Sequence, residues 1–343
     1  MLKIMKDSIQ KTYMFGTDLA NTDSVLNIAY GVDKNFMFGA AISMQSICDY
    51  NSTLNLKFHI FTDYIDDEYL ARAELFSKKS NVHLSIYVVS QDFVKIFPSV
   101  KQWSHATFFR FLAFEKLSYI CDRVLYIDAD VICKDDILSL NELNFDSEKY
   151  VAVVKDNAYM QGKPAERLNV PGLAGNYFNA GVIYLNLSEW KRRGFIHKAI
   201  SMLNDDPNHM KYKCLDQDIL NILFFGGCIY LNNAFNQLYG IDYELRNKSG
   251  SEYLKSIKSD TKLIHYVGIT KPWHTWATYP SGKFFRDAYN HSAWFDIPLL
   301  DASGEKQYKV RFRHSFKKSL ISQSIIYYIK YQTVKVLNKL GSK

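Results

Sequence analysis

Short apolar segments alternate with longer amphipathic ones along most of the chain, and this order limits the folds that it can adopt. The short segments are rich in β-branched and aromatic residues and lie at 26–30, 56–63, 82–89 and 123–130. Between them, residues 36–50, 66–80 and 106–120 have the length and spacing of helices. This order predicts an α/β fold with a mostly parallel sheet, whose ligands bind beyond the carboxyl ends of the strands.

The same pattern continues after residue 150. Further strands are expected at 150–156, 178–187 and 262–268, and further helices begin near Ser188 and Asp216. A chain of 343 residues exceeds the commonest domain size, so one large domain with appendages is expected. We expect an N-terminal extension over 1–24, the main domain over 25–300 and a separate tail over 301–343.

The composition limits the class of protein and the cellular location that we expect. Hydrophobic residues make up 48% of the chain, which rules out a disordered or fibrous protein. The N-terminus has no apolar signal segment, and no apolar stretch is long enough for a membrane span. The five cysteines are scattered, without a C-x-x-C pair. We therefore expect reduced thiols and a cytoplasmic location.

The positive charge is concentrated in the C-terminal tail. Residues 306–343 contain ten Lys/Arg and no Asp/Glu, whereas the rest has 32 basic and 35 acidic residues, a net charge of −3. Apolar side chains recur there at helical spacing, at Phe316, Leu320, Tyr327, Tyr331 and Val334. This pattern predicts a basic amphipathic helix on an anionic membrane surface, and it argues against nucleic acid as a partner. The alternative is a helix that packs its apolar side on the main domain.

Two carboxylates stand at the end of an apolar segment, in Leu125-Tyr-Ile-Asp128-Ala-Asp130. Residues i and i+2 share one face of a strand, so Asp128 and Asp130 are expected to converge and could hold Mg²⁺ or Mn²⁺ against a diphosphate. His265 follows another apolar segment, and a nitrogen ligand would favour Mn²⁺. Lys271 could neutralise a departing phosphate. Alternatively, the acids are a solvated strand end and His265 is structural.

Six motifs then occur in a fixed order. They are GVDKNF at 31–36, RFLAF with Arg110, LYIDADV at 125–131, YFNAGVIYLNL at 177–187, LDQDILN at 215–221 and HYVGITKPWH at 265–274. Together they resemble glycosyltransferase family 8, the retaining nucleotide-sugar transferases with a GT-A fold, over roughly residues 25–280. The resemblance is closest to the enterobacterial lipopolysaccharide core α-glucosyltransferases and α-galactosyltransferases.

The resemblance implies a set of site residues. The metal ligands would be Asp128, Asp130 and His265, and the catalytic residues Gln217, Asp216 and Lys271. The donor, UDP-glucose or UDP-galactose, would contact Gly31, Val32, Asp33, Asn35, Phe36, Arg110, Asp128, Ala129, Asp130, Asp156, Asn179, Ala180, Asp216, Gln217, His265, Gly268 and Lys271. From the pattern of LDQDILN, Ile219, Ile222 and Leu223 should be buried, which leaves Asp216 and Gln217 exposed at a helix start. Helix capping is the alternative role for Asp216.

The expected activity is the transfer of a hexose from a UDP-sugar, with an α linkage retained, to a hexose of the lipopolysaccharide outer core. Attack on the same face as the departing phosphate is favoured, because no nucleophilic carboxylate is evident. The enzyme would work at the cytoplasmic face of the inner membrane. One rival is a non-catalytic carbohydrate- or nucleotide-sugar-binding module that uses Trp103, Trp273, Trp276 and Trp294. A metal-dependent phosphohydrolase is another.

Overall fold

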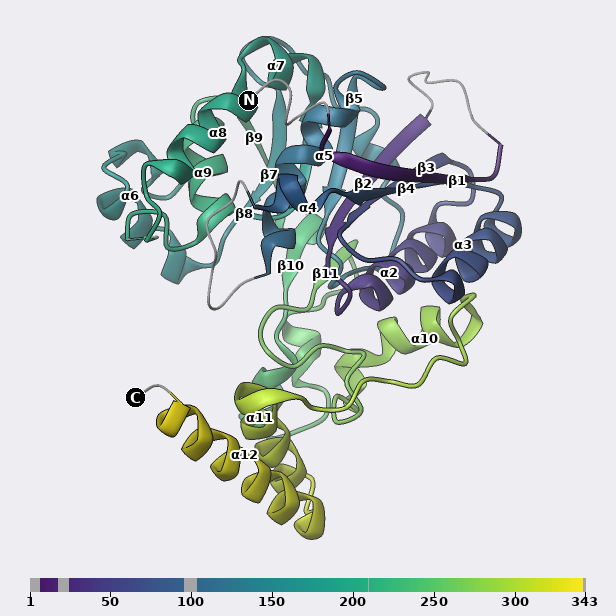
Figure 1. Cartoon of the computed structure of the whole chain (residues 1–343), viewed down its shortest axis with the longest axis vertical. Coiled ribbons are helices and arrows are strands. Elements are labelled where there is room, and N and C mark those ends of the chain that lie inside the picture. Colours follow the sequence, from purple (N-terminus) through teal and green to yellow (C-terminus); the bar gives the residue numbers. More distant parts are fainter. Residues whose placement is uncertain (1–6, 18–24, 96–103, 209, 342–343) are drawn as a thin grey trace.

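The computed structural model describes residues 7–17, 25–95, 104–208 and 210–341 (Figure 1). The strands are β1 (Ile9–Phe15), β2 (Val25–Val32), β3 (Asn55–Thr62), β4 (His83–Val89), β5 (Arg123–Ile127), β6 (Val131–Cys133), β7 (Val151–Lys155), β8 (Phe178–Asn186), β9 (Cys228–Leu231), β10 (Gln237–Leu238) and β11 (Leu263–His265). The α-helices are α2 (Met37–Tyr50), α3 (Asp67–Ser80), α4 (Gln91–Val94), α5 (Phe109–Leu117), α6 (Lys163–Arg167), α7 (Leu187–Arg192), α8 (Phe195–Asn204), α9 (Leu215–Leu223), α10 (Lys283–His291), α11 (Gly304–Lys317) and α12 (Ile321–Gly341).

The large sheet has the strand order β1-β4-β3-β2-β5-β8-β7-β9. Strands β4, β3, β2 and β5 run parallel, whereas β1 and β8 are antiparallel to their neighbours. The predicted mixed, mostly parallel sheet is therefore confirmed. Strand β1 was not predicted, because its half-exposed IQKTYMF sequence lacks the apolar run of the central strands. It lies within the expected N-terminal extension and forms an edge of the sheet.

The acidic motif leaves the sheet earlier than the sequence suggested. A strand was expected through residue 130, but β5 ends at Ile127 and the Val131 N–H donates to the Asp128 carbonyl at 3.0 Å. The chain then enters β6, which pairs antiparallel with β11 in a second, three-stranded sheet. Asp128 and Asp130 are thus brought together by a turn between two sheets and do not share a strand face.

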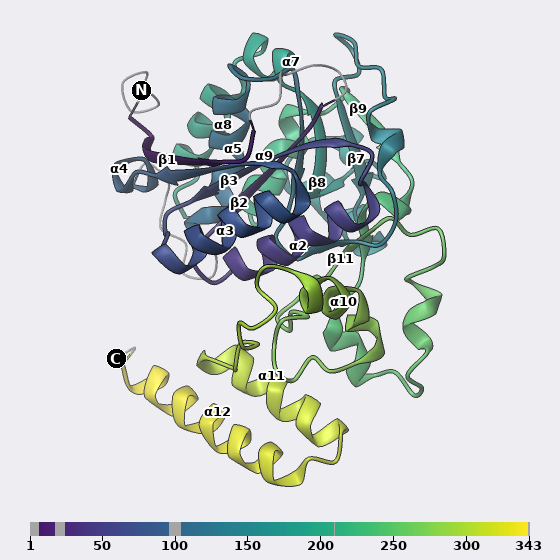
Figure 2. The ribbon, with the colours of Figure 1, turned by 90° about the vertical axis from the view of Figure 1, so that its right-hand side faces the viewer.

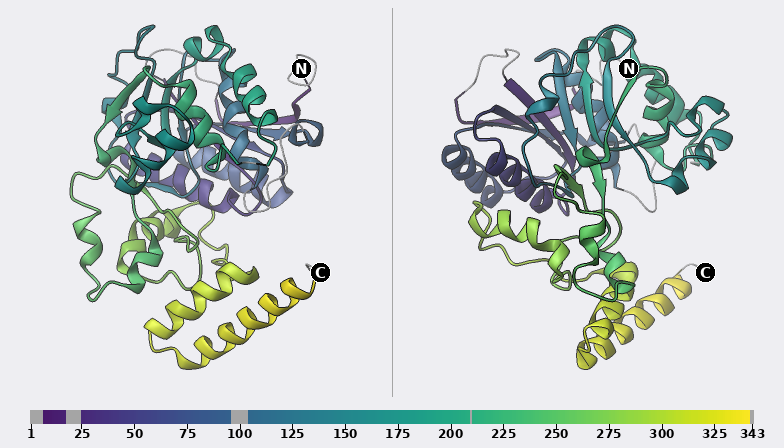
Figure 3. Two further views of the ribbon diagram at one scale, coloured as in Figure 1. Left: turned by 90° about the vertical axis from the view of Figure 1, so that its left-hand side faces the viewer. Right: turned by 180° about the vertical axis from the view of Figure 1, so that it is seen from behind.

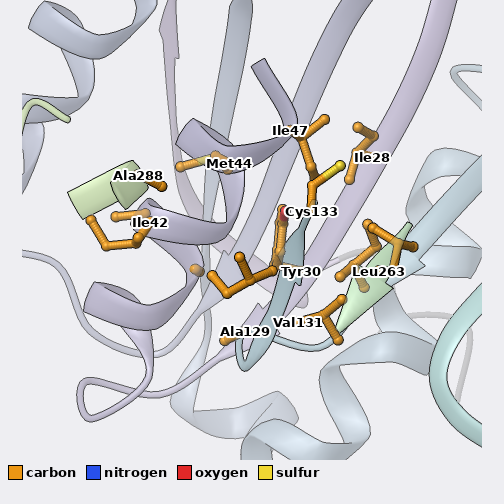
Figure 4. Close-up of a cluster of buried hydrophobic side chains, with 14 of the residues drawn as sticks. Ile28, Tyr30, Ile42, Met44, Ile47, Ala129, Val131, Cys133, Leu263 and Ala288 are labelled. Carbon is orange, nitrogen blue, oxygen red and sulfur yellow. The ribbon is translucent and has the colours of Figure 1, made fainter. Parts of the chain in front are cut away.

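Helices cover both faces of the large sheet, with one apolar core on each side. Helices α2 and α3 pack on one face, with α10 packed against α2, and α5, α7, α8 and α9 pack on the other (Figure 2). In the first core, Ile28 and Tyr30 of β2 pack near Ile42 and Met44 of α2 (Figure 4). Val131, Cys133 and Leu263 of the small sheet belong to the same core, so packing holds the turn with the two acids in place.

The C-terminal tail forms a hairpin of two helices where one amphipathic helix was predicted (Figures 1 and 3). Ser319, with φ 58°, turns the chain between α11 and α12. Helix α11 is attached to the rest of the protein through His314, whose side chain is fully buried. The His314 ring lies 2.7 Å from the Tyr279 hydroxyl and 2.9 Å from the Asp242 carboxylate. Helix α12 packs on α11 and extends away from the sheets.

The exposed apolar face of α12 differs from the predicted one. Tyr327 is buried and its ring contacts Tyr308 of α11, so the predicted stripe at 327, 331 and 334 faces α11 instead of solvent. The large side chains exposed on α12 include Ile321, Ile325, Ile326, Ile329, Val336, Leu337 and Leu340. We call these seven residues the α12 outer face. In the described part of the chain, no helix has the length and apolarity needed to cross a membrane.

One arginine is buried where the sheet meets α5 and α9. Arg110 of α5 donates to the Asp128 carboxylate at 2.8 Å and to the Ala180 carbonyl at 2.8 Å. It also lies 2.9 Å from the Asp216 carboxylate of α9, and its guanidinium stacks 4.7 Å from the Tyr126 ring centre. A buried cation needs such partners, because leaving it unpaired would cost several kcal/mol, roughly 3–5. Arg110 therefore ties α5, α9, β8 and the acidic turn together.

The charged form of Asp216 remains unfavourable in spite of its pairing with Arg110. Burial raises the pKa of its carboxyl to about 6, although Arg110 and a 2.5 Å hydrogen bond from the Thr107 hydroxyl act in the opposite direction. In the unfolded chain the same carboxyl has its ordinary pKa of 3.8. The Asp216 contribution to folding stability is therefore most favourable below about pH 4 and is lost as the pH rises through about 6.

We predict that this loss depends on the Asp216 carboxyl. Asp216→Asn retains an oxygen for Thr107 but does not titrate. The quantity to follow is the free energy of unfolding of the wild type minus that of Asp216→Asn. This difference should fall by about 2 kcal/mol between about pH 4.5 and 7, because each pKa unit corresponds to about 1.4 kcal/mol. Urea unfolding at the two pH values measures this difference. A difference that stays constant or rises with pH would contradict the prediction.

Candidate functional site

The candidate site lies at the carboxyl ends of β2 and β5. These neighbouring parallel strands lie where the strand order reverses direction, the position at which open α/β sheets bind ligands. Gly31 and Val32 end β2, and the turn after it carries Asp33, Asn35 and Phe36. The turn after β5 carries the acids, with the buried Ala129 between them. Both sets of predicted site residues therefore lie at the carboxyl ends of strands.

The end of β2 is hydrogen-bonded to β5, and the turn after it packs on a neighbouring loop. The Gly31 N–H donates to the Tyr126 hydroxyl at 3.1 Å, and a Cβ at Gly31 would lie 2.9 Å from that oxygen. The Asp33 carboxylate accepts from the Asn35 N–H at 2.9 Å, which orders the start of α2. The Phe36 ring meets Trp273 edge-on at 5.7 Å and lies 5.9 Å from the Lys271 ammonium. This turn therefore borders the loop at 266–274.

Asp128, Asp130 and His265 form a compact cluster. Their ligand atoms all lie within 4.8 Å of one another. His265 Nε2 is 3.2 Å from the Asp130 carboxylate and 4.0 Å from that of Asp128. His265 ends β11, which pairs with β6 immediately after the acidic turn. The predicted convergence of these three side chains is thus present, and the pairing of β6 with β11 is its cause.

A chain of amides determines how the His265 ring presents its nitrogens. The Gly181 N–H donates to Asn179 Oδ1, which also accepts from Asn236 Nδ2 at 2.9 Å. Asn236 Oδ1 consequently faces His265 Nδ1 at 3.1 Å and accepts its proton. The other ring nitrogen, Nε2, is directed at the two carboxylates. This is the arrangement of a metal-binding histidine, whose second nitrogen donates to an oriented partner.

The cluster fits a divalent cation. His265 Nε2 and the Asp130 carboxylate lie 3.2 Å apart, a spacing that either a proton or a cation between them would bridge. Two carboxylates and one imidazole suit Mn²⁺, and carboxylates alone suit Mg²⁺. Burial disfavours the charged form of Asp130, but Lys271 and His265 outweigh it and hold the pKa of this carboxyl well below its usual range. Asp130 is therefore ionised and available as a ligand.

Lys271 belongs to the same cluster. Its ammonium donates to the Asp130 carboxylate at 2.5 Å and to the Tyr266 carbonyl at 2.9 Å. The loop that carries it contains Gly268, whose φ of 98° is a conformation that side chains rarely adopt. Burial, together with the nearby Lys271 charge, lowers the pKa of His274 to about 3. The neutral His274 ring accepts the Lys271 N–H at 3.0 Å and orders the loop.

Gln217 is held by partners on both sides of its amide. Its Oε1 accepts from the Ala180 N–H at 3.0 Å, and its Nε2 donates to the Asp156 carboxylate at 3.0 Å. A donor on one side and a carboxylate on the other permit a single orientation of the amide. Asp156 also accepts from the N–H and the side-chain amide of Asn157, and from Asn179 at 3.4 Å. Gln217, Asp156, Asn179 and Ala180 therefore form one connected group.

The prediction that Asp216 is exposed at the start of α9 is wrong. Its carboxylate is buried against Arg110 and Thr107, because the charge of Arg110 requires a partner. Ile222 and Leu223 are only half-buried, whereas the polar Asp218 is fully buried and pairs with Arg167 at 2.6 Å. The helix thus turns its acidic residues inward. Apolar spacing alone could not reveal this, because the buried partners come from distant segments.

Sequence reasoning missed four residues that support the site, namely Thr107, Tyr126, Gly181 and Asn236. Tyr126 and Gly181 lie within two of the motifs but were given no role there, and Thr107 and Asn236 lie outside them. Each acts through a hydrogen bond or close packing across the fold, which a local pattern does not reveal. The rival binding module needed exposed tryptophans, but Trp273, Trp276 and Trp294 are all buried. They serve the core and cannot stack on a sugar. Trp103 lies outside the described residues.

Known proteins and family models match this chain along most of its length. The family model described as glycosyl transferase family 8 matches residues 27–277, and that of the family's C-terminal region matches residues 279–335. A lipopolysaccharide 1,2-glucosyltransferase of Escherichia coli K12 is 39% identical over 304 residues, 89% of each chain. A lipopolysaccharide 1,3-galactosyltransferase of Salmonella typhimurium is 35% identical over 333 residues, 97% of this chain and 98% of that protein.

Solved structures agree on the fold. The galactosyltransferase LgtC, solved with donor and acceptor sugar analogs, superimposes with a TM-score of 0.61 at 25% identity, covering 77% of this chain and 95% of that one. The bifunctional glycosyltransferase WbbM gives a TM-score of 0.64 at 20% identity, covering 81% of this chain and 52% of that one. The expected GT-A type fold and the family resemblance are thereby confirmed. The chain belongs to glycosyl transferase family 8.

Proposed function

We propose that this protein transfers a hexose, glucose or galactose, from a UDP-hexose to a hexose of the lipopolysaccharide outer core, with an α linkage retained. The observation that carries the proposal is the cluster of Asp128, Asp130, His265 and Lys271 at the strand-end site of a family 8 fold. The similarity to enzymes named for glucosyl and galactosyl transfer to lipopolysaccharide supports the substrate class.

The donor occupies the strand-end site with its nucleoside over the turn at 31–36. Gly31 and Val32 bring the backbone close to the ligand, and Asp33, Asn35 and Phe36 line the nucleoside side. The diphosphate lies between the acidic turn and the 266–274 loop, near Gly268 and Lys271. Asp128, Asp130 and His265 would hold Mn²⁺ or Mg²⁺, which supplies positive charge to the departing diphosphate. The sugar then reaches Asp156, Asn179, Ala180 and Gln217.

Lys271 acts on the leaving group. Breaking the bond between the anomeric carbon and the phosphate oxygen leaves negative charge on UDP. The Lys271 ammonium already lies among the acids of the site, so a short movement of its flexible side chain pairs it with the diphosphate. This pairing favours departure of UDP.

The buried acids around the sugar position are all engaged in other interactions. Asp156 accepts from Asn157, Asn179 and Gln217, and Asp216 is bound to Arg110 and Thr107. Carboxylates held in this way are poor nucleophiles at the anomeric carbon. Their engagement supports attack by the acceptor hydroxyl on the face that UDP leaves. The acceptor proton then passes to the departing phosphate oxygen, which balances the charges.

Gln217 stabilises positive charge on the sugar ring through the oxygen end of its amide. The amide orientation is fixed before the donor binds, because Asp156 and the Ala180 N–H hold both ends. Fixed dipoles need no reorganisation during the reaction, and they lower its barrier for that reason. Gln217 is therefore expected to affect the maximal rate more than donor affinity.

The α12 outer face attaches the enzyme to the cytoplasmic surface of the inner membrane. At about 100° per residue, Lys330 lies at one border of this face and Lys335 and Lys339 at the other. An apolar face bordered by lysines is typical of helices that lie in an anionic membrane surface. Each basic residue near such a surface contributes about 1 kcal/mol, and salt weakens this attraction.

We expect the purified protein to transfer hexose from UDP-glucose or UDP-galactose to truncated core lipopolysaccharides. A panel of the two donors, with UDP-GlcNAc for comparison, identifies the sugar and the acceptor together. The anomeric proton of the product, observed by NMR, should show an α linkage. A β linkage, or no transfer with any donor, would contradict the proposal.

The metal site can be tested at Gly181. A Cβ at this position would lie 2.2 Å from the His265 ring, so Gly181→Ala should displace the ring from the acids. We expect at least about tenfold weaker Mn²⁺ binding by calorimetry, and a comparable loss of transfer, as is typical when a group that orients a ligand is changed. Gly162→Ala is the matched control, because its Cβ would meet no atom within 4 Å. Transfer that persists in excess EDTA would rule out the metal role.

Membrane attachment depends on two isoleucines of the α12 outer face, Ile325 and Ile329, each more than half exposed. Ile325→Ser/Ile329→Ser should abolish sedimentation with anionic liposomes and leave transfer to a soluble acceptor within about twofold, since both lie outside the site. Leu75→Ser/Phe295→Ser removes two exposed apolar side chains elsewhere and is the control. Equal sedimentation of the two variants would mean that α12 is not the attachment surface.

A further inference from the structure

A hollow of about 850 Å³ lies between α11 and the turn at Ile241–Leu245. Its walls include Asp242, Tyr243, Leu245, Arg246, Ile269, Val310, Phe312, Arg313, Phe316 and Lys317. Its volume lies within the roughly 300–1,000 Å³ typical of small-molecule sites. The proposed transfer reaction uses none of these side chains.

The hollow is positively charged, with three basic side chains and one carboxylate in its lining. Arg246 and Arg313 are exposed, and within the described residues no carboxylate lies within 4.0 Å of either. Lys317 donates to the Asn247 carbonyl, which leaves its charge uncompensated. The acid in the wall is Asp242, and hydrogen bonds from His314 and the Thr270 N–H occupy its carboxylate. Three cations therefore surround a space in which no carboxylate is free.

Aromatic and apolar side chains form the rest of the surface. Tyr243 is 50% exposed and Phe316 65% exposed, so each presents an open ring. Val310 and Leu245 add apolar surface to the same lining. Exposed rings can pack against the apolar face of a sugar, while arginine forks bind phosphate oxygens in pairs. The combination suits a saccharide that carries an anionic group.

The hollow connects the reaction site to the membrane-facing helix. On one side, Ile269 follows Gly268 directly, and Asp242 accepts from the N–H of Thr270 in the same loop. On the other side, the Phe312 ring contacts Tyr328 of α12 at 5.2 Å. An acceptor that is anchored in the membrane and extends toward the 266–274 loop would therefore pass over the hollow.

We infer that this hollow binds a phosphorylated sugar of the acceptor saccharide, located between the membrane anchor and the hexose that receives the new residue. The inference rests on the proposed function, because it assigns the inner part of the same acceptor. Two guanidinium groups match a phosphate monoester better than they match a neutral sugar, and the exposed rings accommodate the sugar that carries it. The site distinguishes phosphorylated from unphosphorylated acceptors.

The test uses two deacylated, water-soluble core oligosaccharides that differ only in their phosphate groups. For Arg246→Gln/Arg313→Gln, we expect at least a tenfold rise in KM and in Kd for the phosphorylated oligosaccharide. The kcat, the KM for UDP-hexose and the Kd for the unphosphorylated oligosaccharide should change less than twofold. Lys306→Gln/Lys309→Gln removes two charges from the same helix outside the hollow and should behave as wild type.

The outcomes test the assignment of the hollow and the proposed transfer function separately. Equal binding of both oligosaccharides by the wild type, or equal weakening of both in the arginine variant, overturns the assignment of the hollow. An effect that appears only when the acceptor is carried in anionic vesicles identifies a lipid headgroup site and also overturns it. Phosphate-dependent binding without hexose transfer contradicts the proposed function alone, whereas transfer without phosphate dependence contradicts the inference alone.

Discussion

The buried charge of Arg110 is the interaction on which the organisation of the site depends. Its guanidinium bonds to Asp128, Asp216 and the Ala180 carbonyl, and so joins the acidic turn to α9 and β8. A cation in this position imposes its partners, because an unpaired buried charge is too costly to tolerate. The position of Asp128 follows from this requirement, since one of its oxygens is directed at Arg110 while the other faces His265.

A second constraint acts through amides instead of charges. From the Gly181 N–H, hydrogen bonds run through Asn179 and Asn236 to the His265 ring. Asn179 also approaches Asp156 and Gln217, which extends the same network to the proposed sugar position. One backbone donor thus orients the ring nitrogen proposed to bind the metal and restricts the groups near the proposed sugar position. Such a network tolerates little change, because each member loses its orientation when its neighbour is removed.

Features that depend on the local spacing of apolar residues could be predicted from the sequence. Strands β3 and β4 and helices α2 and α3 were placed to within about one residue, because their apolar spacing matches their burial, whereas β5 was expected to continue to residue 130. The cluster of Asp128, Asp130 and His265 was also expected, but for the wrong geometric reason, since a turn and the pairing of β6 with β11 bring it together. Asn236 and Thr107 were missed because their roles arise from contacts with residues more than 25 positions away. The stripe on α12 was misassigned because α11 covers it, and a periodic pattern does not tell which neighbour buries a face.

The attachment of the tail links the helix proposed to bind the membrane to the geometry of the site. His314 of α11 bonds to Asp242, and Asp242 accepts from Thr270 in the loop that carries Lys271. Trp276 donates to the Thr270 hydroxyl, so the loop is held from two directions. His314 is fully buried, so α11 is fixed to the rest of the protein and would not tilt freely with α12 on the proposed membrane surface. In the proposed membrane-bound state, the hairpin would therefore hold the 266–274 loop at a defined orientation to the membrane surface, as a membrane-anchored acceptor would require.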